Sequence, residues 1–377
     1  MEYIMLKDVC DINMGQSPDS SSYNDDGDGL PFFQGNADFG ERYPVARKWC
    51  SVPTKIAKPE DILISVRAPI GALNYAREKC CIGRGLAALT PDKSKVSPEF
   101  IFWLLKAKNI ELNSKGTGST FKAIGRNVLE ETQVPNVPLT VQSEYSQVLE
   151  RIYAIIQSHK MQLQKLDDLV KARFVELFGA YPHNPMGWKT GTIRDVVTDV
   201  RYGSSRPAVD GGKYPYLRMN NITYGGELDL SDVKRIDVPE NELEKCTVHR
   251  GDVLFNRTNS KELVGKTCVY DRDEMMVLAG FVIRVRVNDL VLPEFLSAFL
   301  NTDFSKRTLL GMCKAAIGQA NINAQEMQSI GIYIPPIELQ KEFVQFKNQT
   351  DKSKSAIQKS LETLETLKKA LMQEYFG

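Results

Sequence analysis

One short stretch of the sequence carries residue types that could bind a nucleotide phosphate. Gly265, Lys266 and Thr267 match the last three positions of the phosphate-binding loop GxxxxGK[ST]. The position at which this motif needs its first glycine is occupied by Ser260, and the comparable turn at 69–71 has no lysine. We therefore interpret these residues as a turn between strands rather than as a nucleotide site.

The sequence also lacks the motifs of an enzyme that methylates or cuts nucleic acid. It has no NPPY-like or DPPY-like loop for adenine methylation and no FxGxG motif for a methyl donor. Asp61 and Asp252 precede predicted strands, but no ExK follows either of them, and we interpret both as turn or cap residues. We therefore expect the chain to have no active site and to bind no cofactor of its own.

The composition sets further bounds on function. Hydrophobic residues at 42% and charged residues at 25% are typical of a soluble globular protein. No apolar run approaches the roughly 18 residues of a membrane span, and the first ten residues lack a signal-peptide pattern, so we expect a cytoplasmic protein without a membrane partner. Seven cysteines without a CxxC pair and three scattered histidines predict reduced thiols and no metal site.

Two copies of one helical segment organise the chain. QKLDDLVKARFVELFG, ending at residue 179, aligns without a gap with ETLETLKKALMQEYFG, ending at residue 377, at an offset of 198 (376 − 178). Helical periodicity extends the first copy from Leu139 to Phe178, and about 40 residues make a rod on the order of 60 Å long. The apolar stripes predict that the two helices cover each other, and short connections through globular domains at opposite ends favour an antiparallel coiled coil. The residues assigned to helix pairing are Tyr145, Val148, Ile152, Ile155, His159, Leu163, Leu166, Ile357, Leu361, Leu364 and Leu371.

The segments that precede the helices repeat as well. LKDV at Leu6 returns as IRDV at Ile193, EDILIS at Glu60 as GDVLFN at Gly251, and SPEFIFWLL at 97–105 as LPEFLSAFL at 292–300. Short strand signals alternate with single helices, which indicates an α+β fold. We predict two homologous α+β domains at 1–138 and 181–336, separated by the long helices at 139–180 and 337–377, with a pseudo-twofold internal repeat.

In these marks and in their order, the chain resembles the specificity subunit of type I restriction-modification systems over essentially its whole length. The resemblance implies a non-catalytic subunit whose two target recognition domains each read one half of a bipartite DNA sequence. It also implies that the helices fix the spacing between the halves and dock two adenine methyltransferase subunits, which bind S-adenosylmethionine. Restriction and motor subunits would join the same complex.

The residue types in the loops agree with this role. Arginine can read guanine, and asparagine or glutamine can read adenine, through paired donors and acceptors in the major groove. With a net charge of +1, either the positive charge gathers on local faces or the affinity for DNA comes partly from partners. The candidate DNA contacts of the first domain are Gln34, Asn36, Arg67, Arg84, Lys115, Thr117, Ser119 and Lys122. Those of the second domain are Arg201, Ser205, Arg206, Arg218, Asn220, Asn256, Arg257, Asn259, Lys261, Lys314, Gln319 and Asn321.

One alternative stays open at this level. The chain could be a protein-interaction scaffold whose lobes bind proteins and whose helices only dimerise. The Arg, Asn and Gln residues concentrated in loops that differ between the repeats favour DNA recognition. A scaffold would show no preference for any duplex sequence, even with a methyltransferase partner present.

Overall fold

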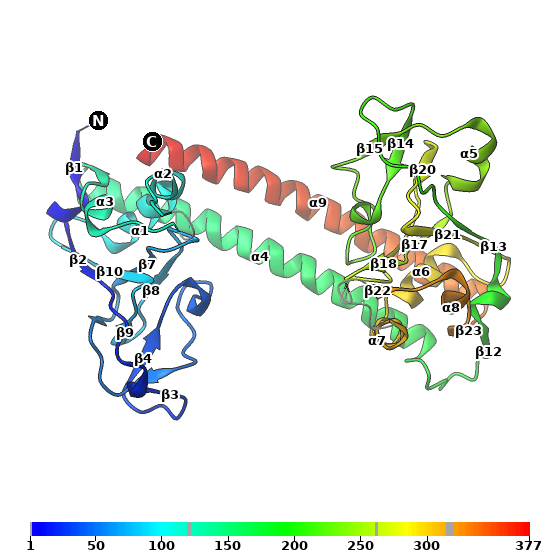
Figure 1. The fold of residues 1–377 in the computed structure, drawn as a ribbon, viewed down its shortest axis with the longest axis horizontal. Coiled ribbons are helices and arrows are strands. Elements are labelled where there is room, and N and C mark those ends of the chain that lie inside the picture. Colours follow the sequence, from blue (N-terminus) through cyan, green and yellow to red (C-terminus); the bar gives the residue numbers. More distant parts are fainter. Residues whose placement is uncertain (1, 119–121, 261–262, 314–319) are drawn as a thin grey trace. The chain divides into compact units, whose positions relative to one another are not determined.

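The computed structural model describes residues 2–118, 122–260, 263–313 and 320–377, so the candidate contacts Ser119, Lys261, Lys314 and Gln319 lie outside the described residues. The chain forms two compact units, one of residues 1–160 and 359–377 and the other of residues 161–358. Each unit contains one lobe of strands and short helices together with a segment of both long helices (Figure 1). We call residues 2–138 the first lobe and residues 181–336 the second lobe.

The first lobe is built on three sheets, whose strands are antiparallel except for one parallel pair. The four-stranded sheet has the order β2 (Cys10–Met14), β10 (Leu86–Pro91), β7 (Ile62–Ser65) and β8 (Leu73–Tyr75). The five-stranded sheet has the order β3 (Tyr23–Asn24), β5 (Trp49–Cys50), β4 (Leu30–Phe33), β9 (Cys80–Ile82) and β6 (Ile56–Ala57), with β4 and β9 parallel, and β1 (Tyr3–Met5) pairs with β11 (Gln133–Pro135). The helices are α1 (Pro98–Ala107), α2 (Asn109–Ser114) and α3 (Arg126–Glu130). Ser97 caps α1 as predicted, because its Oγ accepts a hydrogen bond from the Phe100 backbone N–H at 3.1 Å.

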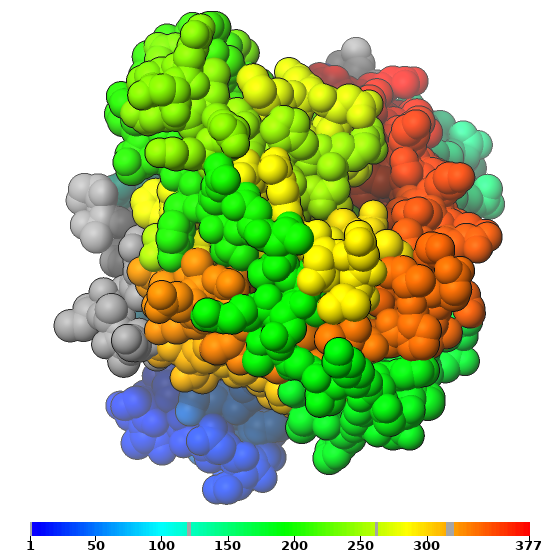
Figure 2. Space-filling model, turned by 90° about the vertical axis from the view of Figure 1, so that its right-hand side faces the viewer, coloured from blue at the N-terminus to red at the C-terminus, as the bar shows by residue number. Residues whose placement is uncertain are grey.

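The second lobe repeats this plan. Its central sheet has the order β13 (Val197–Tyr202), β21 (Val282–Val287), β17 (Val253–Asn256) and β19 (Thr267–Val269), and a second sheet has the order β15 (Lys234–Ile236), β14 (Tyr214–Leu217), β20 (Met276–Leu278) and β16 (Thr247–Val248). Two strand pairs complete it, β12 (Lys189–Thr192) with β23 (Gly331–Ile334) and β18 (Thr258–Asn259) with β22 (Ala320–Asn321). The helices are α5 (Glu240–Cys246), α6 (Pro293–Leu300), α7 (Asp303–Met312) and α8 (Ala324–Gln328). Figure 2 shows a face of this unit on which the segment with β13, in green, lies beside the yellow segments.

The sequence repeat therefore corresponds to a structural repeat. In each lobe, a buried strand, β7 or β17, lies inside a four-stranded antiparallel sheet. The helix that follows this sheet, α1 or α6, buries its aromatic face in the main core of its own unit. The predicted α+β class, with two related domains, is confirmed.

The two long helices are α4 (Leu139–Phe178) and α9 (Ile337–Phe376), and α4 has the predicted bounds. They lie side by side in each unit (Figure 1). In the first unit, the rings of Tyr145 and Tyr375 stack with centroids 3.8 Å apart. In the second unit, Phe174 packs edge-on against Phe343 with centroids 5.3 Å apart. Because contacts further along α4 meet residues earlier in α9, the pairing is antiparallel, as predicted.

The predicted pairing stripe is wrong at two positions of α4. Val148 and Ile155 are 37% and 44% exposed, whereas their neighbours Leu149 and Ile156 are buried. Leu149 joins the core of the first unit, so this part of α4 is covered by the lobe as well as by α9, and its apolar face is rotated. The other assigned residues are buried or half-buried: Tyr145, Ile152, His159, Leu163, Leu166, Ile357, Leu361, Leu364 and Leu371.

Candidate nucleic-acid interface

Backbone hydrogen bonds align four segments of the first lobe beyond the ends of β4, β7 and β9. The Gly85 N–H donates to the Gln34 carbonyl at 3.2 Å, and the Val66 N–H donates to the Gly85 carbonyl at 2.9 Å. On the other side, the Ala68 N–H donates to the Lys122 carbonyl at 3.0 Å. We call the surface made by residues 34, 66–68, 84–85 and 117–124, as far as they are described, the first ridge.

The first ridge gathers five of the predicted DNA contacts. Gln34, Arg67, Arg84, Thr117 and Lys122 are all exposed on it. Sequence reasoning missed Ser17, whose hydroxyl accepts hydrogen bonds from the Gln34 amide at 3.0 Å and from the Arg84 backbone N–H at 3.3 Å. These bonds fix the side chain of Gln34 and the backbone of Arg84.

Two predicted contacts of the first lobe have local roles. The Lys115 ammonium pairs with the Glu111 carboxylate, one helical turn earlier, at 2.7 Å. Asn36 is half-buried at the start of a 3-10 helix, Asn36–Asp38. Both residues are close to the ridge segments along the chain, but neither takes part in the backbone hydrogen bonds that build the first ridge.

The second lobe repeats the ridge with different side chains. The Arg257 N–H donates to the Phe281 carbonyl at 3.0 Å, and the Ile322 N–H donates to the Arg257 carbonyl at 2.9 Å. In the first lobe, Val66 makes the same two bonds, to Gly85 and from Ile124. Residues 204–205, 257–259, 280–281 and 321–322 therefore form a second ridge equivalent to the first.

Arg257 is held in place on the second ridge. Its guanidinium lies 4.8 Å from the centroid of the Tyr202 ring, and among the described residues no partner takes its buried Nε. The Tyr202 hydroxyl in turn accepts the Ala324 N–H at 2.9 Å. An arginine stacked on an aromatic ring suits bidentate recognition of a base edge. Tyr202 was missed from sequence because it reads as an ordinary strand aromatic.

The asparagines of the second ridge differ in how available their amide groups are for a base contact. Asn256 is fully buried, and neither of its amide atoms has a partner in the described part of the chain. Asn259 uses its Oδ1 to accept the Ser260 N–H, while Asn321 is exposed and accepts a hydrogen bond from the Thr258 hydroxyl at 3.2 Å. Asn321 is therefore a better candidate for a base contact than the two other asparagines.

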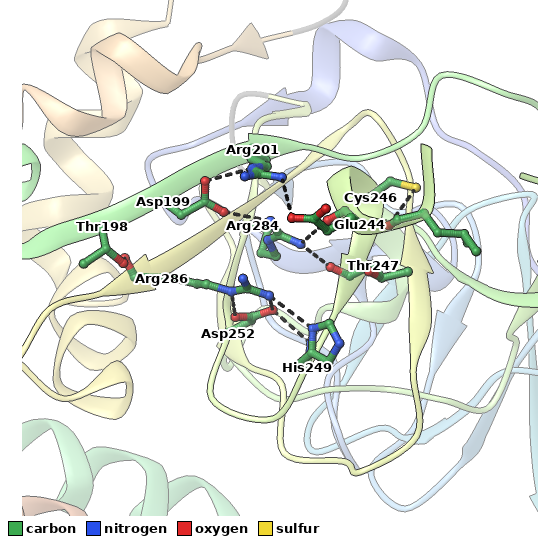
Figure 3. A network of polar contacts seen from close by, with 11 residues as sticks. Thr198, Asp199, Arg201, Glu244, Cys246, Thr247, His249, Asp252, Arg284 and Arg286 are labelled. Carbon is green, nitrogen blue, oxygen red and sulfur yellow. Dashed lines mark hydrogen bonds and ion pairs between the residues drawn. The ribbon is translucent and has the colours of Figure 1, made fainter. Parts of the chain in front are cut away.

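Arg201, predicted as a DNA contact, lies in an ion-pair network instead. Successive residues of β13 point to opposite faces, so Arg201 points away from the face on which Tyr202 meets Arg257. Its guanidinium bonds to the Asp199 carboxylate at 2.8 Å (Figure 3). Sequence alternation within β13 could have separated these two neighbours.

The centre of this network is Arg284, which is 1% exposed. It donates to the Asp199 carboxylate at 2.7 Å and to the carbonyls of Glu244 and Thr247 at the end of α5 (Figure 3). Burial disfavours the charged form of Asp199, but hydrogen bonds from Arg284 and Arg201 outweigh it and the pKa of Asp199 is lowered. The network therefore fixes α5 against the central sheet.

Two more predicted contacts are arginines that already have carboxylate partners. Arg206 bonds to Glu242 at 2.8 Å, and Arg218 bonds to Asp232 at 2.8 Å. These pairs are partly exposed, so the carboxylates can give way to a phosphate at small cost. Ser205 and Asn220 are exposed nearby in the sequence.

The residues weighed for nucleotide binding or for nuclease chemistry have structural roles. Lys266 precedes β19, and its ammonium donates to the Met219 carbonyl at 2.9 Å, so the predicted strand turn is confirmed. Asp61 and Asp252 accept hydrogen bonds from the backbone N–H groups of Lys58 and His249, which confirms them as turn caps.

Burial raises the pKa of three thiols, Cys10, Cys80 and Cys268, to about 12.

Among the described residues, no group of three or more His, Cys, Asp or Glu side chains could hold a metal ion. In the same residues, no helix combines the length and the apolarity needed to cross a membrane.

Burial of Lys306 makes the stability of the second unit depend on pH. Desolvation, followed by the charge of Lys266, lowers the pKa of Lys306 to about 8, although its ammonium donates to the Gly265 carbonyl at 2.8 Å. An unfolded lysine titrates near 10.4, so keeping the Lys306 ammonium charged in the folded protein costs about 3 kcal/mol of stability. This cost is fully present below pH 8 and disappears as the pH rises towards about 10.

We therefore expect the wild-type chain to gain unfolding free energy relative to the Lys306→Met variant between about pH 8 and pH 10. Urea denaturation at pH 7, 8, 9 and 10 measures this difference. The lost hydrogen bond to Gly265 adds a constant that does not vary with pH. A difference that stays flat across this range would contradict the assignment.

The two repeated lobes with their equivalent ridges define a class of two-lobed, internally repeated proteins without catalytic motifs. More particularly, residues 1–167 and 185–368 match the family model of the type I restriction modification DNA specificity domain. The chain belongs to this family.

Relatives and solved structures agree with this assignment. The chain is 42% identical over 160 residues to the putative type I restriction enzyme MjaX specificity subunit of Methanocaldococcus jannaschii, which covers 42% of this chain and 38% of that protein. It is 24% identical over 310 residues to the type I restriction enzyme EcoKI specificity subunit of Escherichia coli, which covers 76% of this chain and 66% of that protein.

The fold is similar to the crystal structure of a type I restriction-modification S subunit from M. genitalium, with a TM-score of 0.59 and 13% identity over 100% of this chain and 96% of that one. It is also similar to a chain from a study of complex assembly in the type I R-M system, with a TM-score of 0.61 and 17% identity over 100% and 97%. At these identities the similarity shows the fold alone.

Proposed function

We propose that this chain is the non-catalytic DNA-specificity subunit of a type I restriction-modification complex and that each lobe reads one half of a bipartite target. The observation that carries the proposal is that the two lobes build the same hydrogen-bonded ridge and place different side chains on it. Val66 is replaced by Arg257, and Gly85 by Phe281, at positions that make the same backbone bonds. A shared framework with different base-reading side chains suits recognition of two different half-sites.

The site geometry supports direct readout more than phosphate binding alone. Arg67 and Arg84 are exposed beside Gln34 on the first ridge, and Arg257 lies close to Asn321 on the second. These are the residue types that distinguish guanine and adenine in the major groove. Lys122 and Thr117 suit phosphate contacts, which position a protein without specifying a sequence.

The long helices supply the remaining roles in this proposal. They fix the gap between the half-sites and dock two adenine methyltransferase subunits, which bind S-adenosylmethionine, and restriction and motor subunits join the same cytoplasmic complex. Apolar side chains on α4 and α9 are exposed and available for protein contacts in this docking role: Val148, Ile155, Met161, Leu169, Val175 and Leu367.

Mapping methylated adenines tests the proposal directly. Cells that express this chain together with its methyltransferase should carry methyladenine at a single bipartite sequence, and cells without this chain should lose that pattern. A pattern that persists without the chain, or the absence of any sequence preference in duplex binding by the complex, would support the scaffold alternative and contradict the proposal.

A matched insertion tests the spacing role. The boundary between the two units falls after Lys160 in α4 and before Lys359 in α9. Seven extra residues at both sites lengthen each helix by about 10 Å, which corresponds to about 3 base pairs of DNA. We expect the unspecified gap to grow by about this amount while both half-sites stay the same. A gap of unchanged length in the methylation map would rule this role out.

A further inference from the structure

The two ridges differ in chemistry at one tight turn. In the first lobe, the Leu86 N–H donates to the Gly83 carbonyl at 3.0 Å, and Arg84 and Gly85 occupy the two central positions of the turn. In the second lobe, the Val282 N–H donates to the Ala279 carbonyl at 2.9 Å, and the central residues are Gly280 and Phe281. An arginine followed by a glycine is thus replaced by a glycine followed by a phenylalanine.

Backbone contacts confirm that the two turns are equivalent. The Gly83 N–H donates to the carbonyl of Phe33, the last residue of β4, and the Ala279 N–H donates to the carbonyl of Leu217, the last residue of β14, both at 2.8 Å. A side chain at Gly85 would have its Cβ 2.4 Å from the Gln34 carbonyl oxygen, so this position of the first lobe has no room for one. The second lobe has that room and fills it with an aromatic ring.

Phe281 is an unusual residue for an exposed turn. The residue is 52% exposed, although aromatic residues normally bury most of their surface. Its carbonyl accepts the Arg257 N–H, so it is next to the arginine that stacks on Tyr202. On the other side, the Gly280 N–H donates to the Ser204 carbonyl at 2.7 Å. The ring therefore stands in the middle of the second ridge.

We infer that Phe281 is a specificity-determining residue of the second lobe and that it reads thymine by covering the C5-methyl group in the major groove. The inference rests on the proposed function of the second lobe. Phenylalanine offers no hydrogen bond, so the feature it can distinguish in the major groove is the apolar methyl group of thymine. Arg84, its neighbour in the equivalent turn, offers the donors that suit guanine, so the two lobes differ at this turn in the base that they accept.

Replacement of thymine by deoxyuridine removes only the methyl group and tests this inference. The full chain in complex with its methyltransferase subunits is titrated with duplexes of the mapped target, in which each thymine of the second half-site is replaced in turn. Fluorescence anisotropy at a fixed salt concentration gives Kd. We expect one replacement to weaken binding about fourfold, the effect of burying one methyl group.

The Phe281→Ala variant should bind the thymine duplex more weakly and should no longer distinguish thymine from deoxyuridine at that position, whereas Phe281→Leu should retain part of the discrimination. Leu290→Ala is the matched control, because Leu290 is 44% exposed and follows the opposite end of β21. Leu290→Ala should keep the full effect of the replacement.

The inference fails if the wild-type complex binds every deoxyuridine duplex as well as the unmodified target, or if the second half-site contains no thymine. It also fails if Phe281→Ala weakens binding equally on all sequences, as a minor-groove wedge would. In these cases the complex still prefers its target, so the proposed function stands. If the complex shows no sequence preference at all, the proposed function fails together with the inference.

Discussion

Replacing Arg257 by alanine is expected to weaken binding to the target about 5-fold to 150-fold, which corresponds to a loss of about 1–3 kcal/mol. The Tyr202 ring orients the Arg257 guanidinium, and hydrogen bonds with Phe281 and Ile322 fix the Arg257 backbone. An ordered fork of donors loses little entropy on binding, so its removal costs the full value of a bidentate base contact.

The loss should be specific to one base pair. Binding is measured on a set of duplexes, each substituted at one position of the second half-site. At the position that Arg257 reads, we expect Arg257→Ala to bind all base pairs with nearly equal affinity. Arg257→Lys keeps the charge but not the fork, and it should recover little. Arg250→Ala is the matched control, because Arg250 is exposed and paired with Asp273 away from the ridge.

Equal weakening on target and non-target duplexes by Arg257→Ala, together with recovery by Arg257→Lys, would show that Arg257 contacts a phosphate. In that case the slope of log Kobs against log salt should fall in magnitude by about one unit for the variant. The salt series therefore separates the two roles in a single experiment.

Replacing Arg284 by methionine should lower the unfolding free energy of the second unit by about 3–5 kcal/mol. The change leaves the Asp199 carboxylate paired with Arg201 and removes the Arg284 donor from the carbonyls of Glu244 and Thr247. Thr247 is buried, and a buried carbonyl that loses its hydrogen-bond donor is costly. Loss of the network should also free α5 from the central sheet.

Urea denaturation followed by circular dichroism measures this loss in the transition of the second unit. Arg272→Met is the control, because Arg272 is exposed and pairs only with its neighbour Asp271 among the described ion pairs. The control should stay within about 0.5 kcal/mol of the wild type. A loss below about 1 kcal/mol for Arg284→Met would mean that the network contributes little to holding the lobe together.

The fold was largely accessible from sequence because its main signals are local. The helical period from Leu139 to Phe178 runs without interruption, and the glycine at 179 ends it with a positive φ of 83°. The cap at Ser97 and the proline at 98 mark the start of α1 in the same way. Val148 and Ile155 were misplaced because helices in contact with both a lobe and a partner helix have two apolar faces, and a single stripe cannot represent both.

The candidate site was less accessible because it is assembled by long-range backbone pairing. Arg257 meets Phe281 and Ile322 through hydrogen bonds that no sequence spacing reveals. Phe281 and Tyr202 were overlooked because aromatic residues near strands usually belong to a core. The repeat did contain a usable signal: alignment of the two turns places Gly280 and Phe281 opposite Arg84 and Gly85, and an aromatic residue at a turn that needs glycine elsewhere points to a surface role.

The central claim is that each lobe reads its own half of the target, and a lobe exchange tests it most directly. Residues 188–336 are replaced by the corresponding residues of a family member with a different target, and methylated adenines are mapped in cells that carry the chimera and its methyltransferase. The account predicts a new sequence in one half of the target, with the other half and the gap unchanged. A chimera that changes both halves, or neither, would contradict it.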